Sequence, residues 1–407
     1  MAIHSLIGTP SSRARCLRWL FAAAAFGLGG LSPALAADTA APVEVRIPWP
    51  PAPFLGDDGQ VHLAYEMHVT NFYRDTGVLR LRRIAVFAEN SATPLRTFEG
   101  QTLEEIMSPR PADGAASADS VPIGPGLRAV AFIWLSQPHN QPQPRWLRHE
   151  LEFETAAGTT QWVNGAKVAI DAGRPAVLGP PLNGGRWLVV EGPGNSRSHH
   201  WGSLVAANGE VTIPQRYALD LFGLDGNGRV LRSGVGDLAG SKGEDWIGFG
   251  QQVLAVADGV VRGVSDGAPD HDPLAPQPEP EALTARALYG NYVVLQIAPG
   301  VFVHYAHLQR DSVEVRPGQS VRRGAVLGRL GQSGNSNGPH LHLQVSNAAT
   351  FEESEGLPFV FDAFVARGSW SVTQAIDPEQ TFATRGTERR LQMPLDADVI
   401  EFPPNDR

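Results

Sequence analysis

The segment Ser333-Gly334-Asn335-Ser336-Asn337-Gly338-Pro339-His340-Leu341-His342-Leu343 carries the main signal for the fold. Side chains on a β-strand alternate between its two faces, so the two histidines of a His-x-His pattern share one face. The small residues before them allow a tight backbone turn. One histidine can then bind a metal while the other reaches a water on that metal. A lone His-x-His is a weak signal, and further segments upstream strengthen it.

Length and composition indicate a globular chain of several domains. The 407 residues suggest two or three domains, each with room for a buried core. The 44 glycines and 33 prolines favour short strands joined by turns over a helical protein. The net charge of −9 becomes −12 if residues 1–36 are removed, since they hold three arginines and no acid. Such an acidic protein is not expected to bind nucleic acid.

Residues 1–36 have the pattern of a secretory signal. It comprises a basic region (Arg13, Arg15, Arg18), an apolar run (Trp19 to Leu31) and an A-x-A cleavage site (Ala34-Leu35-Ala36). The apolar run is shorter than the ~20 residues that a spanning helix needs. We expect cleavage after Ala36, no stable membrane insertion afterwards, and an exported protein. The single cysteine, Cys16, lies inside the signal, so disulfides and cysteine ligands are not expected.

Residues 44–173 are predicted to form an immunoglobulin-like β-sandwich. Their clearest strand alternates apolar and polar residues, with Val61, Leu63, Tyr65, Met67 and Val69 on one face. Further strands are predicted at residues 79–86, 129–135, 147–153 and 167–170, with turn signals between them. The scattered histidines of this domain are expected to be structural or solvated: His62, His68, His139 and His149.

Residues 180–370 are predicted to form a second all-β domain, after a Pro/Gly-rich connection at 174–187. Strands are expected at 215–221, 253–257 and 260–261, and a hairpin at 291–297 and 301–308. The polar insertion 265–287 is expected to be a solvated loop. Residues 371–407 form a C-terminal tail with one expected strand near Val399-Ile400.

Asp220 lies between apolar neighbours in a predicted strand. A buried carboxylate without a partner is costly, and a metal would satisfy it. Histidines stand near it in the chain or in other strands, in Ser198-His199-His200 and in Tyr305-Ala306-His307-Leu308. One carboxylate oxygen, two imidazole nitrogens and a water would make a tetrahedral zinc site with an open position. Zinc lowers the pKa of such a water to about 7 and polarises a carbonyl.

The second domain resembles the lysostaphin-type (LytM-like) zinc metallopeptidases, which cut peptidoglycan cross-bridges or stem peptides. The resemblance covers roughly residues 185–350. It is carried, in the order of that family, by Val256-Ala257-Asp258-Gly259-Val260-Val261, Gly290-Asn291-Tyr292-Val293-Val294, Tyr305-Ala306-His307-Leu308, Pro317-Gly318-Gln319-Ser320-Val321-Arg322-Arg323-Gly324, Gly328-Arg329-Leu330-Gly331 and Ser333 to His342. It implies a LytM-like β-sheet peptidase domain that binds Zn²⁺.

The resemblance also implies roles for particular residues. His342 and Asp220 would be zinc ligands, and His340 and His307 would be catalytic. The remaining ligand of the family is a histidine four residues before the aspartate, but Arg216 stands there. Relatives with a similar long insertion before an Arg-Tyr-Ala-x-Asp strand favour His200 as this ligand.

Three other histidines of the second domain need an assignment. His199 stays an alternative to His200 as the first ligand. His304 is three residues from His307, so the two would face opposite ways on a regular strand. His271 lies in the inserted loop and is expected to be solvated.

Together these features predict an exported, periplasmic zinc metalloendopeptidase acting on peptidoglycan peptides. His307 and His340 would orient the attacking water or the oxyanion, and one of them would accept the proton. The sandwich would position the enzyme, cover the groove or bind a partner. One alternative is a non-catalytic LytM-like module that binds or activates a cell-wall amidase. Another is a zinc peptidase that acts on proteins.

Overall fold

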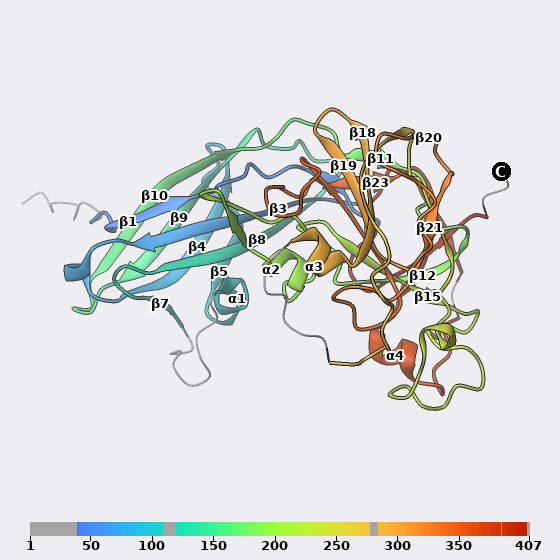
Figure 1. Ribbon diagram of the computed structural model, residues 1–407. Coiled ribbons are helices and arrows are strands. Elements are labelled where there is room, and N and C mark those ends of the chain that lie inside the picture. Colours follow the sequence, from blue (N-terminus) through green and yellow to red (C-terminus); the bar gives the residue numbers. More distant parts are fainter. Residues whose placement is uncertain (1–38, 109–118, 277–283, 384, 405–407) are drawn as a thin grey trace, which may run out of the picture. The chain divides into compact units, whose positions relative to one another are not determined.

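The computed structural model describes residues 39–108, 119–276, 284–383 and 385–404. The secretory signal predicted at 1–36 lies outside these residues. Within them the prediction of an all-β chain is confirmed, because strands form the framework and the helices are short (Figure 1). The helical segments are α1 (Gln101–Glu105), α2 (His199–Gly202), α3 (Ala285–Tyr289), α4 (Val372–Ile376) and the 3-10 turns η1 (Arg74–Thr76) and η2 (Gly243–Asp245). In this part of the chain, no helix has the length and apolar character that crossing a bilayer requires.

Two antiparallel sheets form the first half of the described chain (Figure 1). The first has β1 (Val43–Arg46), β3 (Gln60–Asn71), β8 (Arg128–Pro138) and β6 (Met107–Ser108) in this order, with β2 (Phe54–Leu55) beside β3. The second has β10 (Thr160–Ala169), β9 (Trp146–Glu154), β4 (Leu79–Ala88) and β5 (Pro94–Glu99), with β7 (Val121–Ile123) beside β4. Both sheets contribute to one apolar core. The immunoglobulin-like type of this sandwich stays a prediction.

Strand β3 is buried on both faces, although its alternating pattern predicted a half-buried strand. Leu63, Tyr65 and Met67 belong to the core between the two sheets. The residues between them face the second half of the chain. There Ala64 joins a different core, and its carbonyl accepts a hydrogen bond from the Tyr217 hydroxyl at 3.4 Å. The pattern of one strand therefore cannot reveal the partner that covers its polar face.

A ten-stranded sheet carries the second half of the chain. Its order is β20 (Ser320–Val321), β17 (Gly259–Ser265), β18 (Asn291–Ala298), β19 (Val301–Leu308), β22 (Leu341–Ser346), β15 (Leu219–Leu224), β12 (Gly185–Val190), β26 (Asp398–Phe402), β24 (Phe364–Ser369) and β25 (Thr387–Arg389). Smaller pairs are β11 (Ala176–Leu178) with β23 (Phe359–Phe361), β13 (Val205–Ala207) with β14 (Glu210–Thr212), and β16 (Gln252–Leu254) with β21 (Val326–Arg329).

The structure refines several predicted strands of this half. The hairpin predicted at 291–297 and 301–308 is confirmed as β18 and β19, and the strand predicted near Val399-Ile400 is β26. The strand predicted at 253–257 ends at Leu254. The strand predicted at 215–221 begins only at Leu219. The preceding residues form a turn instead, in which the Ala218 amide donates to the Gln215 carbonyl at 2.9 Å.

Arg216 lies in this turn and is buried between two carboxylates. Its guanidinium pairs with Glu66 of β3 and with Glu355, the latter at 2.6 Å. Burial raises the pKa of Glu355 to about 7, which the Arg216 charge partly offsets. Arg216 therefore joins the sandwich to the second half of the chain through a buried ionic contact.

We predict that Arg216→Met lowers the free energy of unfolding by about 3–5 kcal/mol, because it leaves buried carboxylates without their cation. Denaturant unfolding followed by circular dichroism would measure this. The matched control is Arg145→Met, since Arg145 is exposed and its pair with Glu89 is a surface one. The control should change stability by less than about 1 kcal/mol. Equal effects of the two substitutions would contradict this account of Arg216.

His149 is buried in the sandwich core and held neutral. The Tyr65 hydroxyl donates to its Nε2 at 2.7 Å, and its Nδ1–H donates to the Ala166 carbonyl at 2.8 Å. Burial lowers the pKa of His149 to about 4. The structural role expected for this histidine agrees with these contacts.

His149 should make stability depend on pH. In the unfolded chain this histidine is protonated below about pH 6.5. In the folded chain it is protonated only below about pH 4. Stability is therefore lost as the pH falls through this window. The variant His149→Gln can keep both hydrogen bonds. We predict that its free energy of unfolding falls by about 2 kcal/mol less between pH 7 and pH 4.5 than that of the wild type. Unfolding titrations at several pH values would check this, with exposed His139→Gln as the control. Parallel pH profiles for wild type and His149→Gln would refute it.

Candidate metal centre and active site

Strand pairing brings the predicted site residues together. Asp220 on β15 lies opposite His342 on β22, and His342 lies opposite Ala306 on β19, next to His307. His340 immediately precedes β22, and His200 comes from α2. All five side chains, His200, Asp220, His307, His340 and His342, are buried.

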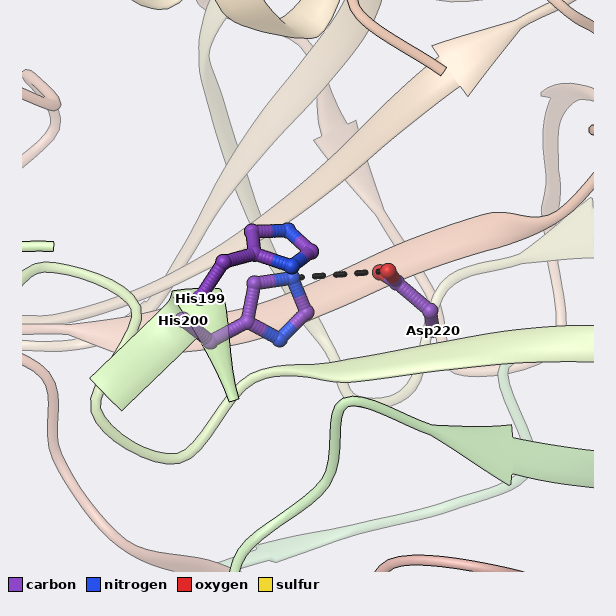
Figure 2. Close-up of side chains that lie close together, drawn as sticks. All are labelled: His199, His200 and Asp220. Carbon is purple, nitrogen blue, oxygen red and sulfur yellow. Dashed lines mark ion pairs between the residues drawn. The ribbon is translucent and has the colours of Figure 1, made fainter. Parts of the chain in front are cut away.

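Three imidazoles lie within hydrogen-bonding range of the Asp220 carboxylate. His342 Nδ1 is 2.9 Å and His340 Nε2 is 3.3 Å from Oδ1, and His200 Nε2 is 3.4 Å from Oδ2. Figure 2 shows His200 with its ring nitrogen directed at Asp220. Burial raises the pKa of Asp220, but positive charge at the positions of His340 and His200 would outweigh it and lower this pKa well below its usual range. Asp220 is therefore the centre of the site and carries a negative charge.

The position of His200 is set by its helix and by one backbone carbonyl. The Ser198 side chain caps α2 by accepting a hydrogen bond from the His200 amide at 3.1 Å. The ring Nδ1–H of His200 donates to the Glu191 carbonyl at 3.0 Å, which leaves Nε2 as a bare lone pair. Burial lowers the pKa of His200 to about 3, so the ring is neutral. A lone pair, and not a proton, therefore faces Asp220.

His342 is oriented by Gln344, two residues further along the same strand. The amide nitrogen of Gln344 donates to the Pro214 carbonyl at 3.2 Å, which fixes the orientation of the amide. Its oxygen then accepts from His342 Nε2–H at 2.9 Å. In the neutral ring the remaining lone pair is on Nδ1, the atom that faces Asp220.

His340 and His307 are held in the same way. The Nδ1–H of His340 donates to the Gly338 carbonyl at 2.7 Å, and that of His307 donates to the Ser333 carbonyl at 2.9 Å. Each ring therefore keeps Nε2 as an acceptor. The two ring centres are 4.7 Å apart. Burial also lowers the pKa of His307 well below its usual value, which keeps this ring neutral.

This donor set fits a metal cation. A carboxylate and several imidazole lone pairs would repel one another unless a positive charge lies between them. Carboxylate oxygen and neutral imidazole nitrogen are ligands of zinc, and hydrogen bonds from the distal ring nitrogens to carbonyls typically orient such ligands. Asp220 with His200 and His342 would hold zinc, and the open side would face His340 and His307.

His199 differs from His200 although the two are neighbours. Its side chain is 65% exposed, and its Nδ1 pairs with the Glu191 carboxylate at 3.2 Å. Burial opposes its charged form, but Glu191 and Asp220 outweigh burial and raise the pKa of His199. Its nearest ring nitrogen still lies within 4.8 Å of the ligand atoms of His200 and Asp220 (Figure 2). His199 therefore lies at the edge of the site.

Two further histidines of the second half have other partners. His304 lies opposite Gln344 in the pairing of β19 with β22, and therefore on the same face as His342. Its Nε2 lies 2.7 Å from the Ser346 hydroxyl. The expectation that His304 and His307 face opposite ways assumed a regular strand, but His307 has a φ of 59°. The loop composition predicted that His271 is solvated, but this histidine is hydrogen-bonded within the protein. Its Nε2–H donates to the Gly334 carbonyl at 2.9 Å, because the described part of the inserted loop packs against the turn before His340.

Sequence reasoning missed the residues that orient the site histidines. Gln344 could have been found, because it lies two residues after His342 and therefore on the same face of the strand. Glu191 follows β12 and meets His200 only through the pairing of Val190 with Asp220. No short-range sequence signal identifies such a partner.

The site opens into a cavity of about 650 Å³, which we call the site cavity. Glu191 and His199 line it beside His200. Other parts are lined by apolar side chains from β12, β15, residues 230–246 and α4. Its volume lies within the range of small-molecule and peptide subsites.

Comparison with known proteins identifies the class. Residues 239–353 match the model of Peptidase family M23. The resemblance to lysostaphin-type peptidases is therefore confirmed for residues 239–353. The matched segment includes His307, His340 and His342, whereas His200 and Asp220 precede it.

Several characterised proteins match parts of the chain. The peptidoglycan DD-endopeptidase ShyC of Vibrio cholerae is 29% identical over 119 residues, which are 29% of this chain and 23% of ShyC. The DD-carboxypeptidase/endopeptidase Mpg of Neisseria meningitidis is 45% identical over 56 residues, 14% of this chain and 12% of Mpg. The catalytic domain of lysostaphin from Staphylococcus simulans has 19% identity, covering 37% of this chain and 80% of that domain, with a TM-score of 0.22. The chain thus matches less than a quarter of the length of either curated relative.

We predict that His200→Ala weakens zinc binding by more than about 100-fold, because it removes a nitrogen that faces Asp220. His199→Ala should weaken it by no more than a few-fold, since this exposed ring already pairs with Glu191. Competition titration against a chelator of known affinity would measure both. A larger loss in His199→Ala would make His199 the first ligand instead.

Proposed function

We propose that this protein is an exported zinc metalloendopeptidase that hydrolyses peptide bonds in peptidoglycan stem peptides or cross-links. The observation that carries the proposal is the convergence of three imidazoles on Asp220, each oriented through its other ring nitrogen. His200, Asp220 and His342 are the proposed zinc ligands. The predicted secretory signal and the cell-wall substrates named for the relatives support a periplasmic location.

The chemistry divides between the metal and two histidines. Zinc bound there supplies Lewis acidity, which polarises the scissile carbonyl and makes a water more acidic. His340 and His307 each present Nε2 as an acceptor, with Nδ1–H held by a carbonyl. One Nε2 takes a proton of the attacking water, and the other accepts a hydrogen bond that orients this water. The imidazolium N–H formed in this way can then donate to the oxygen that gains negative charge. Burial keeps the His307 ring neutral until it accepts a proton.

The names of two relatives support the proposed substrate class. ShyC and Mpg carry names that specify endopeptidase activity, on peptidoglycan in the case of ShyC. Their similarity is limited to segments of this chain, so the whole chain's substrate is part of the proposal. The set of histidines and Asp220 favours catalysis over a non-catalytic module that activates an amidase.

We predict that the protein releases peptide fragments from purified peptidoglycan when zinc is present, and that a chelator abolishes this. His200→Ala and His342→Ala should lose cleavage by at least about 10³-fold, because removing a ligand removes the metal's contribution to the barrier. Mass spectrometry of the released fragments measures the activity and locates the cleaved bond.

His139→Ala is the matched control for these variants, because His139 is an exposed histidine whose ring bonds only to the Gly59 carbonyl among the described contacts. It should keep full activity. Zinc bound at full stoichiometry without any cleavage would contradict the peptidase and turn attention to an amidase partner. Cleavage of unfolded proteins but not of peptidoglycan would contradict the proposed substrate.

A further inference from the structure

The site cavity has two chemically different sides. Beside His200, Glu191 and His199 supply an ion pair. Beyond His340 lies a surface that we call the apolar wall, made of Val230, Leu238, Trp246, Val372 and Ile376. A peptide in the cavity would therefore meet an ion pair beside His200 and this apolar wall elsewhere.

Phe222 connects the apolar wall to the proposed catalytic machinery. The His340 ring stacks on Phe222, with ring centres 4.7 Å apart and planes at 23°. Phe222 in turn packs against Trp246 at 6.2 Å. The wall therefore begins next to a histidine that would contact the reacting atoms. A side chain that enters it belongs to a residue close to the scissile bond.

The apolar wall is a fixed part of the fold. The Val230 amide donates to the Ala375 carbonyl of α4 at 3.1 Å, and its carbonyl accepts from the Ile247 amide at 2.8 Å. Trp370, just before α4, donates from its indole to the Gly228 carbonyl at 2.9 Å. These bonds join residues 228–247 to the segment at 370–376. The wall is therefore preorganised.

Much of the wall lies outside the family match. Val230 and α4 fall outside residues 239–353. Val372 remains 48% exposed while it lines the cavity, so it presents apolar surface that a ligand can cover.

The chemistry of the wall selects its occupant. The one polar side-chain atom among its members is the Trp246 indole nitrogen, which already donates to Ser241 Oγ at 3.1 Å. A charged side chain that entered would lose water and gain no partner there, whereas an aliphatic one would bury apolar surface. We propose that the apolar wall is a specificity subsite that accepts an uncharged aliphatic side chain adjacent to the scissile bond and rejects a charged one. This inference rests on the proposed function for the site.

Binding to the zinc-free protein tests the subsite separately from catalysis. The probes are blocked tetra-alanine and its variants with a single aspartate or valine at each position, in L and D forms. Isothermal titration calorimetry measures the affinity of each. We expect aspartate at one position to weaken binding by about tenfold or more, while valine there does not weaken it.

Val372→Asp changes the wall without disturbing the core. Val372 is half-exposed and follows the helix cap Ser371, where an acidic residue is favourable. Val372→Asp should weaken the binding of tetra-alanine and of its valine variants by about tenfold. Val78→Asp is the control, because Val78 is 40% exposed and does not line the cavity. It should bind like wild type.

The outcomes separate this inference from the proposed function. An aliphatic preference that Val372→Asp removes supports the subsite even if no peptide is cleaved, and that lack of cleavage would count against the peptidase alone. Equal binding of alanine and aspartate probes, or no binding of any probe, overturns the subsite. Peptidoglycan cleavage together with that result would leave the peptidase intact.

Discussion

The antiparallel register between β15 and β22 is the constraint on which the site depends. It places Asp220 beside His342, and the neighbouring pairs place Val190 on one flank and Ala306 on the other. Glu191 comes directly after Val190 in the chain, and His307 comes directly after Ala306. A shift of one residue in β15 would turn Asp220 to the opposite face and remove the centre of the site.

Backbone carbonyls orient most of the histidine rings of this site. Three of the histidines give their Nδ1–H to a carbonyl, and the fourth gives its Nε2–H to an amide whose direction is itself fixed. Each ring therefore reaches the centre with a defined tautomer and little freedom to rotate. This preorganisation lowers the cost of arranging the groups for metal binding or proton transfer.

The all-β class, the hairpin of β18 and β19 and the histidines near β22 could be predicted, because each depends on local alternation or on a compact motif. The start of β15 could not, because the turn around Arg216 is held by glutamates distant in the sequence. Burial of both faces of β3 escaped prediction for the same reason. The role of His200 as a ligand could be predicted only through the family resemblance, because nineteen residues separate it from Asp220.

The contact of Arg216 with Glu66 limits how modular this chain can be. Arg216 of the second half is a buried cation that pairs with Glu66 of the sandwich as well as with Glu355, and Tyr217 packs its ring against Phe54 at 5.5 Å. Trp201, next to His200, packs against Phe132 and Trp134 of β8, each at 5.8 Å. Recombination that exchanged the sandwich for an unrelated domain would expose these groups beside the site. The two halves are therefore expected to diverge together in evolution, with Glu66 and Arg216 changing as a pair.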